Sequence, residues 1–214
     1  MKGESLMNVM EAIQQRHAVR AYKPDPISTD LMKQLLECAR RAPSAVNMQP
    51  WKFIAVTDQV MREKLKAAAG GQSQVSQAPV VLVCLADEAG CDRMAAKMEV
   101  YAENPNIPTP MRESFRKRSE PIKNNADIRK VLAGSNSYIA IAYLTLAAKE
   151  LGLDTCWMTG YDEAEVKKLL NIPSGVHVVS LLTLGYAAEV AVEEHDRLPF
   201  DDIVYGESYG TPLR

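Results

Sequence analysis

The sequence predicts a single domain in which helices and strands alternate along the chain. Its 214 residues suffice for one substantial domain, and its apolar content of 47% is ordinary for a globular protein. Stretches with apolar residues at helical spacing alternate with short runs of β-branched and aliphatic residues, which are typical of strands. No internal repeat or low-complexity segment divides the chain.

The composition argues against several classes of protein. The net charge is -2 and no cluster of Lys and Arg stands out, so we expect no nucleic acid partner. The longest unbroken apolar run, residues 79–86, is too short to span a bilayer, and the N-terminus lacks a signal-peptide pattern. We therefore expect no membrane partner and a soluble, cytoplasmic protein. The cysteines form no close pair and no metal-like spacing with the histidines, so we expect free thiols and no metal.

The first part of the chain should form three helices and two strands. We predict helices over residues 6–15, 28–41 and 59–69, and strands over residues 52–57 and 79–86. Ser28 and Asp58 are suitable N-caps, and Gly70 follows the third helix, as is common. The first helix should bury the face that carries Leu6, Val9, Met10 and Ile13.

Residues 87–125 are the least regular part, and we expect an excursion that lies over the core. It should contain two short helices, over residues 91–103 and 111–119. The spacing of apolar residues predicts a long helix over residues 127–151. This helix is apolar on too many sides for a surface helix, so we place it at the centre of the fold and at a subunit contact. We predict a strand over 153–158, a helix capped by Asp162 up to residue 170, and a strand over 177–186.

Two polar segments are candidates for ligand binding. Arg16, His17 and Arg20 stand where the first helix ends, and the arginine fork suits a phosphate or the carbonyl edge of a heterocycle. The alternative is a solvated helix end, because cations favour a helix C-terminus. Residues 42–51 combine two prolines with small polar side chains and a tryptophan, which indicates a loop that holds a ligand.

The usual nucleotide and nucleophile motifs are absent. No Gly-x-Gly-x-x-Gly follows a strand, no Gly-rich loop ends in Lys-Ser or Lys-Thr, and no serine lies in a nucleophile elbow. The ordinary dinucleotide fold and the kinase-like and hydrolase functions thus lose their main support.

Four stretches together resemble the FMN-dependent nitroreductase family in order and spacing. They are Arg16-His17-Ala18-Val19-Arg20, the loop from Ala42 to Trp51, Leu151-Gly152-Leu153-Asp154-Thr155-Cys156-Trp157-Met158-Thr159-Gly160, and Asp196-Arg197-Leu198-Pro199. The resemblance spans residues 7–205, apart from residues 87–125. Two positions depart from the pattern, with Ala45 where relatives often carry serine and His195 where some carry lysine.

The resemblance implies an α+β fold with a mixed, largely antiparallel sheet flanked by helices, in an intertwined homodimer. Two FMN sites would lie at the interface. The implied cofactor-binding residues are Arg16, His17, Ala18 and Arg197 at the phosphate and ribityl chain, Arg20 at the pyrimidine edge, Pro43, Ser44 and Asn47 from the other subunit, and Met158, Thr159 and Gly160 along the ring. Gln72 is a weaker candidate for the ring, and His195 is either a pH-sensitive phosphate contact or a surface histidine.

The implied function is an FMN-dependent oxidoreductase that takes hydride from NADH or NADPH and reduces nitroaromatic, quinone or related acceptors by a ping-pong mechanism. Flavin N5 would carry the chemistry, so no side-chain acid or base is needed. The excursion would cover the site, with Tyr101 and Phe115 as substrate contacts, unless both simply pack it onto the core.

The alternatives are a flavin-binding carrier or sensor without turnover, a flavin destructase, dehalogenase or dehydrogenase of the same family, and a colourless α/β protein that binds another phosphate-bearing ligand. Neither the acceptor nor a preference between NADH and NADPH follows from the sequence.

Overall fold

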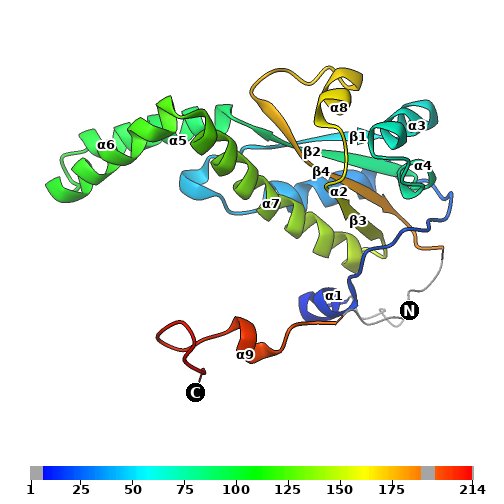
Figure 1. Cartoon of the computed structure of the whole chain (residues 1–214). Helices are drawn as coiled ribbons and strands as arrows, with labels where there is room; N and C mark the ends of the chain where they lie inside the picture. The colour runs from blue at the N-terminus through cyan, green and yellow to red at the C-terminus, as the bar shows by residue number, and fades with distance from the viewer. Residues whose placement is uncertain (1–6, 189–195, 214) are drawn as a thin grey trace.

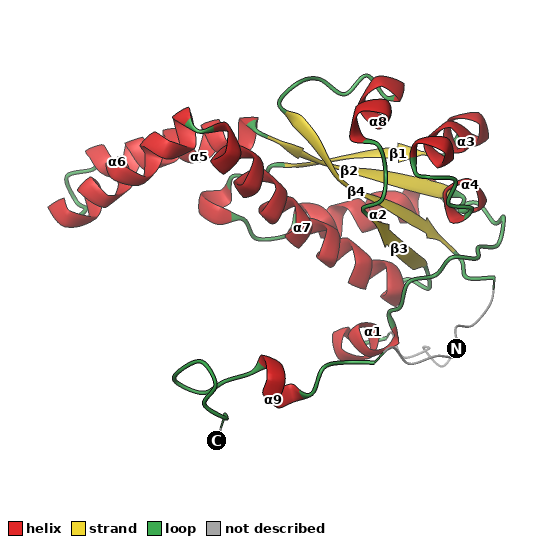
Figure 2. Cartoon of the chain, viewed as in Figure 1, coloured by secondary structure: helices red, strands yellow, loops and turns green. Residues whose placement is uncertain are grey.

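The computed structural model describes residues 7–188 and 196–213. Its strands form one four-stranded sheet in the order β1-β2-β4-β3, with helices on both faces (Figures 1 and 2). The strands are β1 (Trp51–Val56), β2 (Val80–Asp87), β3 (Asp154–Met158) and β4 (Val176–Gly185). Every neighbouring pair is antiparallel, and among the described residues the parallel component is limited to an isolated bridge between Ala18 and Thr155. The predicted α+β class is thereby confirmed.

The central strands β2 and β4 separate two hydrophobic layers. Successive side chains of a strand point to opposite faces, so Leu82 and Cys84 join one layer and Val81 and Val83 the other. All four side chains are fully buried. This burial on both faces explains why β2 reads as an unbroken apolar run instead of an alternating one.

One face of the sheet is covered by two helices, α2 (Thr29–Arg40) and α7 (Ala126–Glu150). The central position predicted for residues 127–151 is confirmed, because Ala140, Ile141 and Leu144 are fully buried in the layer between α7 and the sheet. By length and composition α7 would also suffice to cross a membrane. Packing on the sheet accounts for the buried part of this apolar helix, whereas Val131, Ile139 and Tyr143 stay exposed in the single chain.

The other face is covered by α3 (Gln59–Ala68), α4 (Gln74–Gln77) and α8 (Glu163–Leu169). The predicted caps are confirmed, because Ser28, Asp58 and Asp162 each accept a hydrogen bond from the backbone N–H three residues on. The short helix α4 was not predicted. Its four residues are too few for a periodic pattern.

The excursion consists of two helices longer than predicted, α5 (Ala89–Glu103) and α6 (Thr109–Asn124). They pack on one another and project beyond one end of the sheet, and do not lie over it (Figure 1). The base of this α5–α6 hairpin is anchored in a cluster in which Met94 and Met98 pack with Met48 and Ala86. Pro121 lies inside the last turn of α6.

Both ends of the described chain expose apolar side chains. On α1 (Val9–Gln15) only Ala12 is buried, and Val9, Met10 and Ile13 are 62%, 65% and 50% exposed. The predicted burial is therefore wrong for Val9, Met10 and Ile13 in the single chain, and Leu6 lies outside the described residues. Residues 196–213, with α9 (Phe200–Ile203), extend away from the sheet (Figure 1) and expose further large side chains, Leu198, Phe200, Ile203, Tyr209 and Leu213.

Candidate active site

The segment after α1 lies along the edge strand β3. The backbone N–H of Val19 donates to the carbonyl oxygen of Thr155 at 3.1 Å, and Ala18 forms the parallel bridge with Thr155. The segment 16–20 therefore borders the same strand that ends at Met158. Two stretches that are more than a hundred residues apart in the sequence thus form one continuous edge.

A cavity of about 390 Å³ opens beside this edge, and its volume is enough for part of a cofactor. The cavity beside the edge is lined by Arg16, Ala18, Ala142, Thr145, Leu146 and Trp157. The indole Nε1 of Trp157 donates to Thr145 Oγ1 at 2.8 Å, which fixes the orientation of the ring. A guanidinium group thus stands at the rim of a largely apolar cavity.

Trp157 and Tyr138 were not predicted as site residues. Their rings are stacked, with centroids 6.0 Å apart and planes 11° apart. Tyr138 also lines a second cavity, of about 490 Å³, together with Thr159 and His177. The stacked pair therefore lies between the cavity that contains Arg16 and the cavity that contains Thr159. Trp157 lies within the motif 151–160, so its place in that motif was the sequence signal that could have indicated it.

One ring nitrogen of His17 lacks a hydrogen-bond partner among the described residues. Its Nδ1 is 3.0 Å from the carbonyl oxygen of Gln15, whereas Nε2 is buried and makes no hydrogen bond in the described part of the chain. A buried polar atom without a partner is rare and calls for an explanation. Because Nδ1 carries the proton that meets the carbonyl oxygen of Gln15, Nε2 of the neutral ring is an acceptor, and a ligand hydroxyl group near Arg16 would supply its donor.

The structure places Gln72 against the strip 158–160. Its Nε2 donates to the carbonyl oxygens of Ala69, at 3.0 Å, and Gly160, at 3.1 Å. Gln74 donates to Gln72 Oε1 at 3.0 Å and approaches the sulfur of Met158 at 3.8 Å. Both amide protons of Gln72 are thus used within the protein, which makes it a support for the turn at Gly160. Gln74 is a further residue that sequence reasoning missed.

The loop with Pro43, Ser44 and Asn47 lies elsewhere in the single chain. It contains the 3₁₀ turn η1 (Ala45–Asn47), and Asn47 is exposed while Ser44 is half-buried. Among the described residues, no hydrogen bond joins this loop to residues 16–20 or 158–160. That this loop meets residues 16–20 and 158–160 at one flavin, across two subunits, stays a prediction.

The remaining basic candidates lie at the surface. Arg20 is exposed, and so is Arg197, which donates to the carbonyl oxygen of Asp196 at 3.0 Å. The contact of Arg197 with the phosphate stays a prediction. His195 lies outside the described residues.

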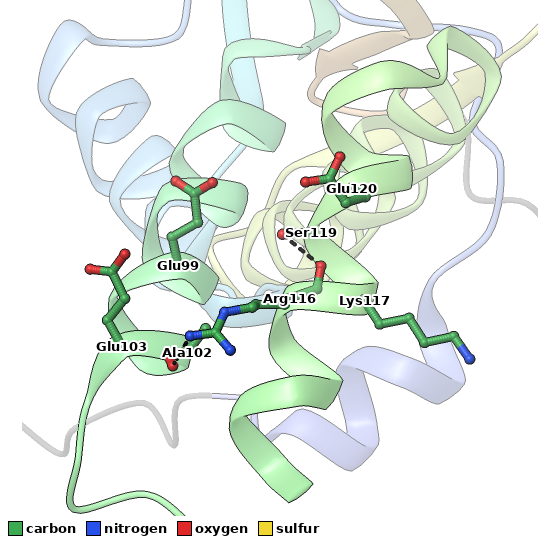
Figure 3. A pocket seen from close by; sticks show the side chains of 7 residues that line it. All are labelled: Glu99, Ala102, Glu103, Arg116, Lys117, Ser119 and Glu120. Atoms are coloured by element: carbon green, nitrogen blue, oxygen red, sulfur yellow. Dashed lines mark hydrogen bonds between the residues drawn. The ribbon is translucent and has the colours of Figure 1, made fainter. Parts of the chain in front are cut away.

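Tyr101 and Phe115 face one another across the α5–α6 hairpin. Their ring centroids are 5.3 Å apart and their planes are tilted by 48°, and Phe115 packs against the cluster at the base of the hairpin. Within one chain both rings thus pack the hairpin together, and their role as substrate contacts stays a prediction. A cavity of about 430 Å³ between the same helices is lined mainly by charged side chains, among them Glu99, Glu103 and Arg116 (Figure 3).

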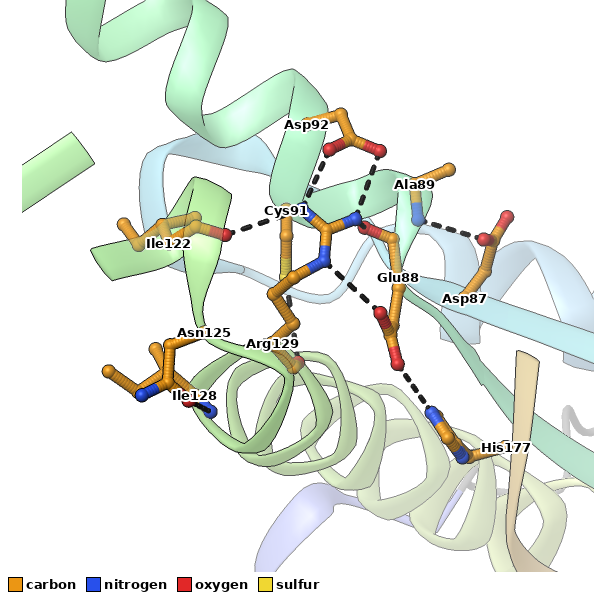
Figure 4. A network of polar contacts seen from close by, with 10 residues as sticks. All are labelled: Asp87, Glu88, Ala89, Cys91, Asp92, Ile122, Asn125, Ile128, Arg129 and His177. Atoms are coloured by element: carbon orange, nitrogen blue, oxygen red, sulfur yellow. Dashed lines mark hydrogen bonds and ion pairs between the residues drawn. The ribbon is translucent and has the colours of Figure 1, made fainter. Parts of the chain in front are cut away.

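A polar network anchors the base of the hairpin to the sheet (Figure 4). Arg129 of α7 pairs with Asp92 at 2.7 Å and with Glu88 at 3.1 Å, and Glu88 Oε1 lies 2.6 Å from His177 Nε2 on β4. His177 and Arg129 hold the pKa of the Glu88 carboxyl below its usual range, and Arg129 does the same for Asp92. The network ties α5, α7 and β4 together.

The other titratable groups do not suggest side-chain catalysis. Cys38, Cys84, Cys91 and Cys156 are free, and burial raises the pKa of the Cys84, Cys91 and Cys156 thiols, so these three are poor nucleophiles. Within residues 7–188 and 196–213, no group of three His, Cys, Asp or Glu side chains has a metal-binding arrangement.

Comparison with known proteins decides the family. The sequence profile described as the Nitroreductase family matches residues 13–186. The chain belongs to the nitroreductase family. It is thus an enzyme of the NAD(P)H nitroreductase and FMN reductase type, and the resemblance seen in the four motifs is confirmed.

Individual relatives agree with this assignment. The chain is 35% identical over 201 residues to a Thermus thermophilus protein named NADH dehydrogenase, covering 93% of this chain and 96% of that one. It is 28% identical to a Bacillus subtilis protein named FMN reductase [NAD(P)H], covering 94% and 74%. A nitroreductase homologue from Exiguobacterium sibiricum in complex with FMN superposes with a TM-score of 0.78 at 26% identity, covering 95% of this chain and 99% of that one.

Proposed function

We propose that this family member binds FMN, takes hydride from NADH or NADPH and passes electrons to a nitroaromatic, quinone or related acceptor. The observation that carries the proposal is the pairing of Ala18 with Thr155, which sets the basic segment 16–20 beside the strip that ends at Gly160. The names of the relatives and the FMN complex of the Exiguobacterium homologue support the choice of cofactor and donor.

The phosphate of FMN would lie near Arg16, His17 and Arg197. Hydrogen bonds from arginine to a phosphate are charge-assisted and roughly twice as strong as neutral ones. Arg20 would meet the pyrimidine edge, where a cation stabilises the anionic reduced flavin and raises its reduction potential. FMN supplies the hydride chemistry when bound, and the protein supplies its binding, orientation and electrostatics.

The ring would extend along Met158, Thr159 and Gly160. Gln72 holds the carbonyl oxygen of Gly160 and so restrains the end of this strip from the side of α3. Pro43, Ser44 and Asn47 would reach the ring from a second subunit, because a single chain does not bring them to it.

We further propose that the functional unit is a homodimer. The outer surface of α7 exposes Val131, Ile139 and Tyr143, and α1 exposes Val9 and Met10. Extensive apolar exposure is characteristic of an interaction surface. A second copy is the partner that would also supply the missing loop, and the exposed apolar side chains of residues 196–213 are suited to pack on it.

The test is the visible spectrum of the purified protein before and after anaerobic addition of NADH or NADPH. We expect flavin absorption bands that bleach with at least one donor and return with a quinone or nitroaromatic. A yellow protein that neither donor bleaches would favour a carrier or sensor. A colourless protein that does not take up FMN would refute the proposal.

A further inference from the structure

We propose that Arg93 is a positioning residue that holds the loop 44–50 in the conformation that presents Ser44 and Asn47 to the flavin. The inference rests on the proposed function, because it assigns a role toward the same cofactor. It concerns a residue on α5 that none of the sequence motifs includes.

The loop has an unusual backbone. Val46, Asn47 and Gln49 have φ angles of 49°, 58° and 43°, in the left-handed region that L-residues rarely adopt. For a β-branched residue such as Val46 this conformation is a genuine outlier. Strained residues of this kind persist only where their surroundings enforce them, and they cluster at ligand clamps and active sites.

Arg93 contributes three hydrogen bonds to that enforcement. Its Nε and Nη2 donate to the carbonyl oxygen of Met48 at 3.1 and 2.9 Å, and Nη2 also donates to the carbonyl oxygen of Gln49 at 2.9 Å. The three hydrogen bonds hold two successive carbonyl groups next to the left-handed residues. The planar fork of arginine is suited to this arrangement, and the single ammonium of lysine is not.

Two other contacts leave the loop little freedom. Asn136 on α7 accepts a hydrogen bond from the backbone N–H of Ala45 at 2.8 Å, and Ser44 Oγ accepts one from the N–H of Gln49 at 3.1 Å. A Cβ added to Gly90 would lie 2.9 Å from Pro50 Cβ, so α5 packs against the end of the loop as closely as glycine allows.

The arrangement also couples the loop to the α5–α6 hairpin. Arg93 lies on α5, one residue from Asp92, and Asp92 pairs with Arg129 of α7. A displacement of α5 would therefore move the carbonyl groups of Met48 and Gln49. A ligand that binds at the α5–α6 hairpin and shifts α5 would thus change the conformation of the loop 44–50 beside the flavin.

The experiment compares Arg93→Lys, which keeps the charge but not the fork, with Lys97→Met, at an exposed position one turn further along the same helix. We expect Arg93→Lys to weaken FMN binding about tenfold in titrations of the full-length apoprotein, and Lys97→Met to leave it unchanged. Hydrogen exchange of the apoprotein should accelerate at residues 44–50 and stay unchanged in β2 and α7. In Arg93→Ala, added guanidinium should restore part of the affinity.

The outcomes separate this proposal from the proposed function. If the wild type binds FMN while Arg93→Lys has the same affinity, the positioning role is wrong, whatever the exchange of the loop. Unchanged loop exchange in the apoprotein would also overturn it. If the wild type binds no FMN, the proposed function fails and this role toward flavin falls with it, while the exchange data still report whether Arg93 restrains the loop.

Discussion

The side-chain amide of Gln72 donates a 3.1 Å hydrogen bond to the carbonyl oxygen of Gly160, which is 88 residues further along the chain. This contact joins the turn after α3 to the end of β3. Because Gln74 orients the same amide through Gln72 Oε1, the carbonyl oxygen of Gly160 is held in one direction. The strip proposed to follow the flavin ring is therefore supported from behind by two glutamines.

Gln72→Met should weaken FMN binding about two- to tenfold, because the hydrogen bond to the carbonyl oxygen of Gly160 contributes about 0.5–1.5 kcal/mol to holding the strip. The measurement is a fluorescence titration of apoprotein with FMN. Gln77→Met is the matched control, since Gln77 is exposed on the adjacent helix α4. Equal affinities for both variants would show that the contact does not support the site.

Arg197→Ala should loosen FMN by about 1.5–3 kcal/mol, the usual contribution of a hydrogen bond to a charged group. The dissociation constant should rise by about one to two orders of magnitude, and FMN should be lost during gel filtration. Arg118→Ala, at an exposed position on α6, serves as the control. Full retention of FMN by Arg197→Ala would refute the placement of this residue at the phosphate.

Ile139→Glu should convert the protein to monomers that retain little FMN, because Ile139 belongs to the exposed apolar surface of α7. Obligate interfaces typically bury about 2,000 Å² or more, and a buried unpaired charge is costly there. Light scattering coupled to size exclusion measures the mass. Val60→Glu places the same charge at an exposed apolar position on α3 and should stay dimeric. A stable FMN-loaded wild-type monomer at low concentration would contradict the dimer.

Arg129→Met should lower the free energy of unfolding at pH 7 by about 1.5–3 kcal/mol, because it removes charge-assisted hydrogen bonds to Glu88 and Asp92 while Glu88 keeps His177 as a partner. Denaturant unfolding measures this loss. The folded-state pKa of each carboxyl is lowered, so the stabilisation is present above their ordinary pKa values of 4.5 and 3.8 and is lost as the pH falls through the folded-state values. The wild type should therefore lose stability more steeply in acid than Arg129→Met. Parallel pH profiles would contradict this explanation.

Phe115→Ala should change the KM for the acceptor while leaving the flavin content unchanged, if the α5–α6 hairpin selects the acceptor. One site that serves donor and acceptor in turn predicts parallel lines in initial-rate plots with NADPH and a quinone. Met111→Ala, four residues earlier and exposed on α6, is the control. Intersecting lines together with a trapped ternary complex would refute the shared site.

The sequence was sufficient for elements whose signals are local. Ser28, Asp58 and Asp162 are capping residues wherever they precede a helix, since the hydrogen bond to the third residue is made within one turn. The unbroken apolar run of β2 indicated a strand buried on both faces. The order and spacing of the four motifs were sufficient to indicate the family, because a motif is a pattern of residue types that can be recognised without knowing the fold.

Only the tertiary structure decided which of these segments meet. Two contacts depend on how strands and turns pack, namely the pairing of Ala18 with Thr155 and the hydrogen bond of Gln72 to Gly160. No periodic pattern in the sequence predicts either of them. The α1 face that reads as buried is exposed in the single chain, because amphipathic spacing shows which face is apolar and not what covers it. The role of Arg93 follows the same logic, since its partners are two backbone carbonyl groups 44 and 45 residues away, and backbone carbonyls are the same in every sequence.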